Sequence, residues 1–170
     1  KSGTTLAAST GTWNVASSNN KMDFAEENPM TFATDWKGGN VPGYAWHTSG
    51  SEKGLYDPCP VGYRVPDGGD NGFWATANVK ATDDSSNLGI YWTLADGETT
   101  AWYPAVGYRR YDSGSLIEVG LAGYCWSAST TRNSYDSAYN FRFLNHGSVI
   151  LVYNSNRGYG QSVRCVRESH

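Results

Sequence analysis

The sequence has little charge and no long apolar run. Charged residues make up 17% of the 170 residues, and the formal net charge is −3. Lys and Arg are not clustered, which argues against a nucleic-acid partner and against a polybasic membrane patch, because both need grouped positive charge. The longest apolar run is about five residues, far short of the ~20 that a transmembrane helix needs. We therefore expect no nucleic-acid binding and no direct membrane insertion.

Motifs for catalysis and for metal binding are also missing. The three histidines, His47, His146 and His170, have no zinc-ligand spacing. Neither a Gly-x-Ser-x-Gly nucleophile motif nor a Gly-rich phosphate-binding loop occurs. Residues 67–71 carry carboxylates, but their spacing does not match an EF-hand calcium loop. The sequence predicts no enzyme, no cofactor, no catalytic site and no metal site, while calcium at residues 67–71 and a glycosidase carboxylate pair stay open as alternatives.

The sequence is rich in aromatic residues and glycine. Aromatics make up 14%, with seven Trp and twelve Tyr, and there are twenty Gly. Together with many Ser, Thr and Asn, they indicate one loop-rich, β-containing domain that is long enough for a core. Residues 1–20 are low in apolar content, so we expect a linker or an edge strand there, joined to an upstream region of the same chain. Residues 21–170 form the predicted domain.

The last third of the chain shows the clearest strand patterns. Residues 138–144 alternate, which places their aromatic side chains on one face of a strand. These aromatic residues are Tyr139, Phe141 and Phe143. Residues 149–153 are a continuous apolar run that predicts a short buried strand, and residues 162–166 alternate again. Residues 145–148 predict a turn, because Asn and Gly tolerate positive φ. We predict antiparallel strands joined by short polar loops.

Residues 127–163 have an unusual side-chain composition. Their only acid is Asp136, and they include five Asn, four Tyr and seven Ser. Tyr supplies rigid contact area while Ser and Asn supply adaptable hydrogen bonds, as in antibody binding loops, although small polar residues are also common in ordinary turns. The candidate ligand-binding residues are Arg132, Asn133, Tyr135, Asp136, Tyr139, Asn140, Arg142, Asn145, His146, Tyr153, Asn154 and Asn156.

Four motifs, in this order, give the chain a resemblance to a known family. They lie at residues 57–66 (DPCPVGYRVP), 104–109 (PAVGYR), 123–129 (GYCWSAS), and 156–157 (NR) together with 162–166 (SVRCV). Over about residues 28–168 the chain resembles the fibrobacter major paralogous domain, which is common on the surfaces of gut Bacteroidetes. The resemblance implies a C-type-lectin-like fold, similar to that of the formylglycine-generating enzymes. We therefore expect an α+β domain of mostly short antiparallel strands, with one or two short helices and long loops.

The chain has three cysteines, an odd number, so at least one is unpaired. In the C-type-lectin fold a disulfide typically ties the first helix region to the last strand. The resemblance therefore implies a Cys59–Cys165 bond, and two buried, inert thiols are the alternative. We expect Cys125 to be a small core residue. Formylglycine-generating enzymes use two reactive cysteines close together late in the chain, whereas Cys125 and Cys165 are 40 residues apart.

The resemblance also implies a function. It predicts a non-enzymatic ligand-binding or adhesion domain, exported to the bacterial cell surface, whose ligand is a protein or glycan on another cell or host. C-type-lectin-fold proteins are targets of diversity-generating retroelements, which mutate Asn codons into codons for Tyr, Ser, Asp and His, and residues 127–163 fit that mixture. The alternative is a structural or assembly module of a surface or pilus protein, without a ligand of its own.

Overall fold

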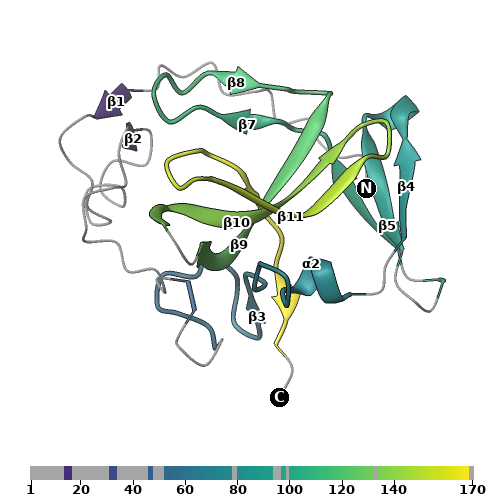
Figure 1. Ribbon diagram of the computed structural model, residues 1–170, viewed down its shortest axis with the longest axis horizontal. Helices are drawn as coiled ribbons and strands as arrows, with labels where there is room; N and C mark the ends of the chain where they lie inside the picture. Colours follow the sequence, from purple (N-terminus) through teal and green to yellow (C-terminus); the bar gives the residue numbers. More distant parts are fainter. Residues whose placement is uncertain are drawn as a thin grey trace.

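The structure, a computed structural model, describes the backbone of residues 14–16, 31–33, 46–47, 52–77, 80–93, 97–98, 100–131 and 134–168. Side chains are described in these ranges except at 14–16, 31–33, 83–85 and 134–136. The described part is mostly β-strands in several small sheets (Figure 1). The strands are β1 (Asn14–Ala16), β2 (Thr31–Ala33), β3 (Tyr63–Arg64), β4 (Lys80–Asp84), β5 (Gly89–Thr93), β6 (Thr100–Pro104), β7 (Tyr108–Arg109), β8 (Leu116–Ile117), β9 (Ala122–Thr131), β10 (Ser134–Leu144), β11 (Val149–Asn156), β12 (Ser162–Val163) and β13 (Val166–Arg167).

Helix is scarce in the part of the chain that the structure describes. It consists of the four-residue α2 (Phe73–Thr76) and the 3-10 helix η1 (Ser85–Asn87). The prediction of mostly short strands with little helix is confirmed for the described residues. The expected class was α+β, but the described chain has so little helix that it is mainly β. Strand β1 lies within residues 1–20 and pairs in parallel with β2.

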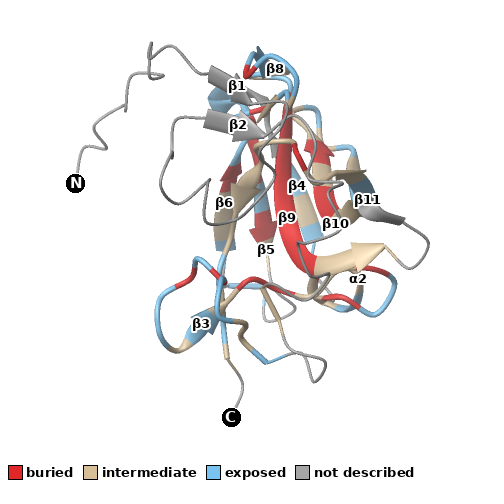
Figure 2. Ribbon diagram, turned by 90° about the vertical axis from the view of Figure 1, so that its left-hand side faces the viewer, coloured by how far each residue is buried: buried red, intermediate tan, exposed pale blue. Residues whose placement is uncertain are grey.

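The largest sheet has the order β11-β10-β9-β12. Strands β9, β10 and β11 form an antiparallel meander. The predicted strands at residues 138–144 and 149–153 correspond to β10 and β11, and their antiparallel pairing is confirmed. The predicted turn between β10 and β11 is also present, and its Gly147 has a φ of 85°. Figure 2 shows β9 buried along most of its length, whereas β11 at the edge of the sheet is not.

The prediction of a buried strand at residues 149–153 is wrong. Among the described strands β11 pairs with β10 alone, and Ile150 and Leu151 are each 38% exposed. The register also shifts where the partner of β11 changes from Asn140 to Arg142, so regular alternation is lost. A continuous apolar run indicates a buried strand only if other elements cover both of its faces, and β11 lacks that cover.

The single strand expected at residues 162–166 is also wrong. The segment is divided between β12, which pairs in parallel with β9, and β13, which pairs antiparallel with β3. Cys165 lies between the two strands and is held by a disulfide to Cys59. The chain therefore leaves one sheet and joins another at this point.

The main core lies between the largest sheet and the β4–β5–β6 sheet. Phe141 is fully buried and stacks on Trp74 with ring centroids 5.5 Å apart. The edge of Trp92 meets Phe141 at 4.9 Å. Phe143 packs against Gly123, where a Cβ would lie 2.1 Å from the ring. Phe141 and Phe143 thus share a buried face as predicted. Cys125 is the expected small core residue, and burial raises the pKa of its thiol to about 12.

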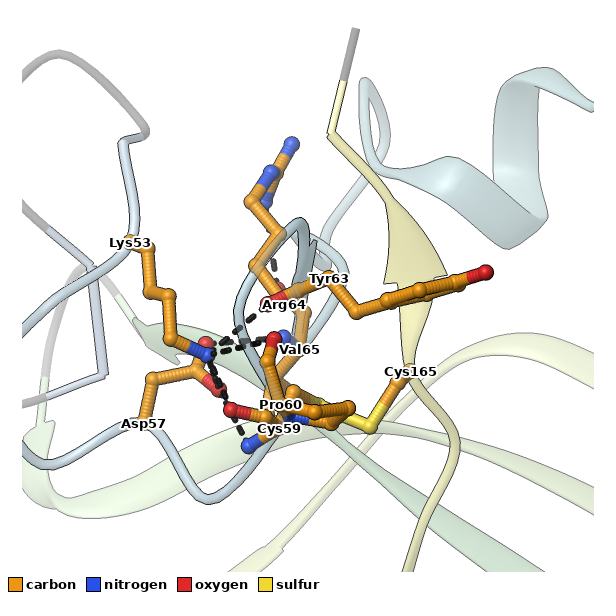
Figure 3. The surroundings of a disulfide bond; sticks show 8 residues. All are labelled: Lys53, Asp57, Cys59, Pro60, Tyr63, Arg64, Val65 and Cys165. Atoms are coloured by element: carbon orange, nitrogen blue, oxygen red, sulfur yellow. Dashed lines mark hydrogen bonds and ion pairs between the residues drawn. A yellow bond between two sulfur atoms is a disulfide. The ribbon is translucent and has the colours of Figure 1, made fainter.

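The disulfide implied by the resemblance is present, with the Cα atoms of Cys59 and Cys165 5.8 Å apart (Figure 3). A buried carboxylate organises the loop around Cys59. Asp57 accepts hydrogen bonds from the backbone N–H groups of Cys59 and Val65, each at 2.8 Å, and pairs with Lys53 at 3.1 Å. Lys53 also donates to the Tyr63 carbonyl at 2.8 Å. The disulfide and this network hold β3 and β13 together at the end of the described chain.

Candidate functional site

The β9–β10–β11 sheet has a core face and an outer face. Phe141 lies opposite Cys125 across β9 and β10, and both side chains are in the core. Arg142 lies opposite Tyr124 at the next position along the two strands. Because successive side chains of a strand point to opposite faces, Arg142 and Tyr124 belong to the outer face.

Arg142 is fixed between two tyrosine rings on this outer face. Its guanidinium carbon lies 5.5 Å from the ring centroids of both Tyr124 and Tyr153, a distance at which a cation is attracted to an aromatic ring. Its Nε donates to the Tyr124 hydroxyl at 2.9 Å, and that hydroxyl donates to Glu118 at 2.6 Å. The Arg142 and Glu118 charges are 3.7 Å apart. The guanidinium is therefore oriented before any ligand arrives.

Further tyrosines continue the surface from the β7–β8 hairpin and the loop after β11. Tyr108 meets Tyr124 edge to face at 5.0 Å and Tyr159 at 5.1 Å, and Tyr111 lies 5.2 Å from Tyr159. We call the whole set the tyrosine–arginine cluster. Its members are Tyr108, Tyr111, Glu118, Tyr124, Arg142, Tyr153 and Tyr159.

The charged side chains of the cluster and of the turn after β7 form two ion pairs. Arg142 is paired with Glu118, and on the exposed turn after β7 Arg110 donates through Nε to Asp112 at 2.8 Å. The hydrogen bond from Arg110 lowers the pKa of Asp112, so this acid is ionised at neutral pH. Burial, followed by the hydrogen bond to Glu118, raises the pKa of Tyr124 far above 10. Tyr124 therefore contributes a neutral hydroxyl, and Arg142 and Glu118 contribute paired charges.

The exposed part of the cluster is formed by rings and hydroxyls. Tyr124 is 5% exposed and forms the floor, whereas Tyr153 is 37% exposed. Tyr108, Tyr111 and Tyr159 are half-buried. Such a surface gives rigid aromatic contact area with hydrogen-bonding groups around it.

For four of the twelve predicted binding residues the structure describes no side chain. Arg132 and Asn133 are outside the described residues, and the side chains of Tyr135 and Asp136 are not described. Arg142 and Tyr153 belong to the cluster. His146, in the β10–β11 turn, and Asn154, on β11, are exposed.

The candidate binding residue Asn140 is not available to a ligand, because it is buried. It lies within β10, is 1% exposed, and donates to Ser155 Oγ at 2.8 Å and to Gln161 Oε1 at 2.7 Å. Asn145 is half-buried and anchors its turn by donating to the Gly120 carbonyl at 2.6 Å. Strand β10 lies between β9 and β11, and side chains from neighbouring segments cover Asn140 and remove it from solvent.

Tyr139 and Asn156 also contribute to local structure. The Tyr139 ring covers Gly69, where an added Cβ would lie 3.3 Å from the ring. Asn156 accepts a hydrogen bond from the Gly158 N–H at 2.8 Å, which shapes the turn after β11. Both side chains are half-buried.

Sequence reasoning missed the members of the cluster outside the predicted set, namely Tyr108, Tyr111, Glu118, Tyr124 and Tyr159. Segment 108–112 (YRRYD) has a visible signal of two tyrosines among paired charges. Its position beside β9 depends on long-range contacts, such as the bridge between Gly107 and Gly123. No local pattern predicts those contacts.

The described ranges contain no candidate metal site and no candidate membrane-spanning helix. No three His, Cys, Asp or Glu side chains there come together as a metal site, and residues 67–71 are included. No helix in the described part of the chain is both long enough and apolar enough to cross a membrane. Comparisons of the chain with protein-family models, with curated proteins and with solved structures gave no match.

Proposed function

We propose that this chain is a non-enzymatic ligand-binding domain of a bacterial surface protein, and that the tyrosine–arginine cluster is its binding face. The observation that carries the proposal is Arg142, fixed between Tyr124 and a solvent-exposed Tyr153. Tyr and Arg are the residues that most often contribute large binding energies at interfaces. A pre-oriented Arg loses little conformational freedom on binding.

Charge balance narrows the class of ligand. Arg142 and Glu118, the charged members of the cluster, form an ion pair, so the cluster itself carries no excess positive charge. A polyanion needs such an excess, so a protein surface or a glycan fits better. Exposed His146 and Asn154 extend the hydrogen-bonding surface over β11 and its turn.

The proposal includes a C-type-lectin-like fold and export from the cytoplasm. The Cys59–Cys165 bond joins the segment before β3 and α2 to the last strands, which agrees with the arrangement expected of that fold. Disulfides persist in oxidising compartments and are rare in the cytosol. The disulfide therefore supports an extracellular location on the bacterial cell surface.

We also propose that retroelement-driven diversification acts on exposed positions of β11 and of the β10–β11 turn. His146 and Asn154 are exposed, so substitutions there would disturb little packing, whereas Asn140 and Asn145 hold neighbouring segments in place. The DNA around the gene tests this idea. A near-identical template repeat with adenines at the variable codons would support it, and a neighbourhood without such a repeat would exclude it.

A screen on glycan and host-surface-protein arrays tests the binding proposal. The native chain is compared with Tyr153→Ala and Tyr111→Ala, which remove cluster rings, and with Tyr56→Ala, which removes an exposed tyrosine from the loop before Asp57. We expect a ligand that binds the native chain and Tyr56→Ala but not the two cluster variants. Thermal melts verify that each variant is folded.

A second candidate function is that of an assembly module without its own ligand. Edge strand β11 favours it, because Ile150, Leu151 and Tyr153 are all exposed on a strand that no other described strand covers on its outer side. Exposed edge strands pair readily with other chains. Light scattering of the native chain and of Ile150→Lys separates the two candidates, since only the assembly module predicts concentration-dependent oligomers that the lysine abolishes.

A further inference from the structure

The β4–β5–β6 sheet carries an aromatic pair on the side away from the core. Along β5, Ile90 and Trp92 are buried while Tyr91 between them is 41% exposed. Along β6, Tyr103 is buried while Trp102 before it is half-buried. Tyr91 lies directly opposite Trp102, so both rings occupy the outer face of the sheet.

The two rings have fixed positions. Their centroids are 5.1 Å apart and their planes are inclined by 52°. The Trp102 indole lies against the backbone of Gly89, where an added Cβ would be only 2.4 Å from its Cη2 atom. Only glycine allows this approach, because a larger residue would lift the indole from the strand. The pair is therefore a pre-formed aromatic surface.

Hydroxyl groups surround the aromatic pair on the same face. Thr82 lies opposite Tyr91 on β4, and Thr93 lies opposite Thr100 across β5 and β6. Thr82 and Thr100 are exposed, and Thr93 is half-buried. A sugar ring has C–H groups on its faces and hydroxyls around its perimeter. A pair of aromatic rings bordered by hydrogen-bonding groups is complementary to it.

The size of this face decides between a sugar and a protein. Five residues of strand span ~16 Å and three strands span ~14 Å, so the face is on the order of 200 Å². A stable protein interface buries about 800 Å² on each partner. The face is much too small for that, whereas one or two sugar rings would cover it.

We propose that the outer face of β4–β5–β6 is a second binding site, and that its ligand is a neutral polysaccharide whose sugar rings pack on Trp102 and Tyr91. The aromatic faces carry partial negative charge, and the C–H groups of a pyranose carry partial positive charge. This site shares no residue with the tyrosine–arginine cluster. The inference goes beyond the proposed function, and each site can be inactivated without changing the other.

The test is native gel electrophoresis of the whole 170-residue chain in gels that contain hydroxyethyl cellulose, xyloglucan or galactomannan. Binding slows migration, and its dependence on polysaccharide concentration gives the affinity. We expect retardation of the native chain by at least one of these neutral polysaccharides. Replacing one stacked ring in Tyr91→Ala should weaken the affinity by about tenfold, and Trp102→Phe should weaken it less.

The control variant is Tyr56→Ala, which removes an exposed tyrosine outside both proposed faces and should migrate like the native chain. If no polysaccharide retards the native chain, or if Tyr91→Ala is retarded as strongly as the native chain, the sugar-binding site is refuted. Tyr91 is exposed, so its replacement leaves the fold intact even if a Trp102 variant unfolds. Array binding that depends on Tyr153 would survive this outcome, so the two proposals can fail separately.

Discussion

Loss of the Cys59–Cys165 disulfide should cost a large part of the free energy of unfolding. The bond joins residues 106 apart in sequence. Cross-linking a loop of this length removes chain entropy from the unfolded state that corresponds to about 5 kcal/mol at 25 °C. A domain of ordinary stability has only about 5–15 kcal/mol in total, so the reduced form should be close to unfolding.

Urea denaturation with and without a thiol reductant measures this cost. With a slope of about 2 kcal/mol per molar, the midpoint should fall by about 2 M or more in the reduced protein and in a Cys59→Ser/Cys165→Ser variant. Cys125→Ala is the matched control, because it removes the buried free thiol and keeps the disulfide. It should retain the full response to reductant. A fall of less than about 1 kcal/mol on reduction would refute the entropic account of this bond.

Further predictions concern Asp57, Gly89 and Tyr124. Asp57→Asn leaves a backbone N–H without its carboxylate acceptor in a buried site, so it should lower the free energy of unfolding by about 3 kcal/mol in urea titrations. Asp112→Asn is the control and should leave the free energy of unfolding nearly unchanged, because solvent screens the exposed Arg110–Asp112 pair. Gly89→Ala forces a contact with the Trp102 indole, so it should cost about 1–3 kcal/mol and also weaken retardation by polysaccharide. The pKa of Tyr124 is higher in the folded chain than its ordinary value of 10.0, mainly because of burial. The contribution of Tyr124 to the free energy of unfolding should therefore be complete below pH 10 and be lost as the pH rises above it. Tyr124→Phe should make this loss of stability at high pH shallower.

The local patterns of the last third predicted much of the sheet. Alternation placed Phe141 and Phe143 together, and they share the buried face of β10. The Asn and Gly residues of the β10–β11 turn predicted its position, because the backbone there needs a positive φ at Gly147. The disulfide followed from the family resemblance, since an odd number of cysteines leaves the pairing undetermined.

Features that depend on long-range packing escaped prediction. The apolar run at Ile150 and Leu151 looks the same in sequence whether its strand is central or at an edge. Asn is a residue type common in loops, but Asn140 is buried and bonded to Ser155 and Gln161. The tyrosine–arginine cluster combines residues from five separate segments, and only the folded chain brings them together.

The central proposal is that the tyrosine–arginine cluster binds a ligand on another cell. The most direct measurement is the affinity of the native chain and of Arg142→Lys for the ligand that the array screen identifies. Lysine keeps the charge but loses the planar group between Tyr124 and Tyr153. We predict a loss of about tenfold or more in affinity with the chain still folded. Equal affinities for a folded Arg142→Lys variant and the native chain would contradict the proposal.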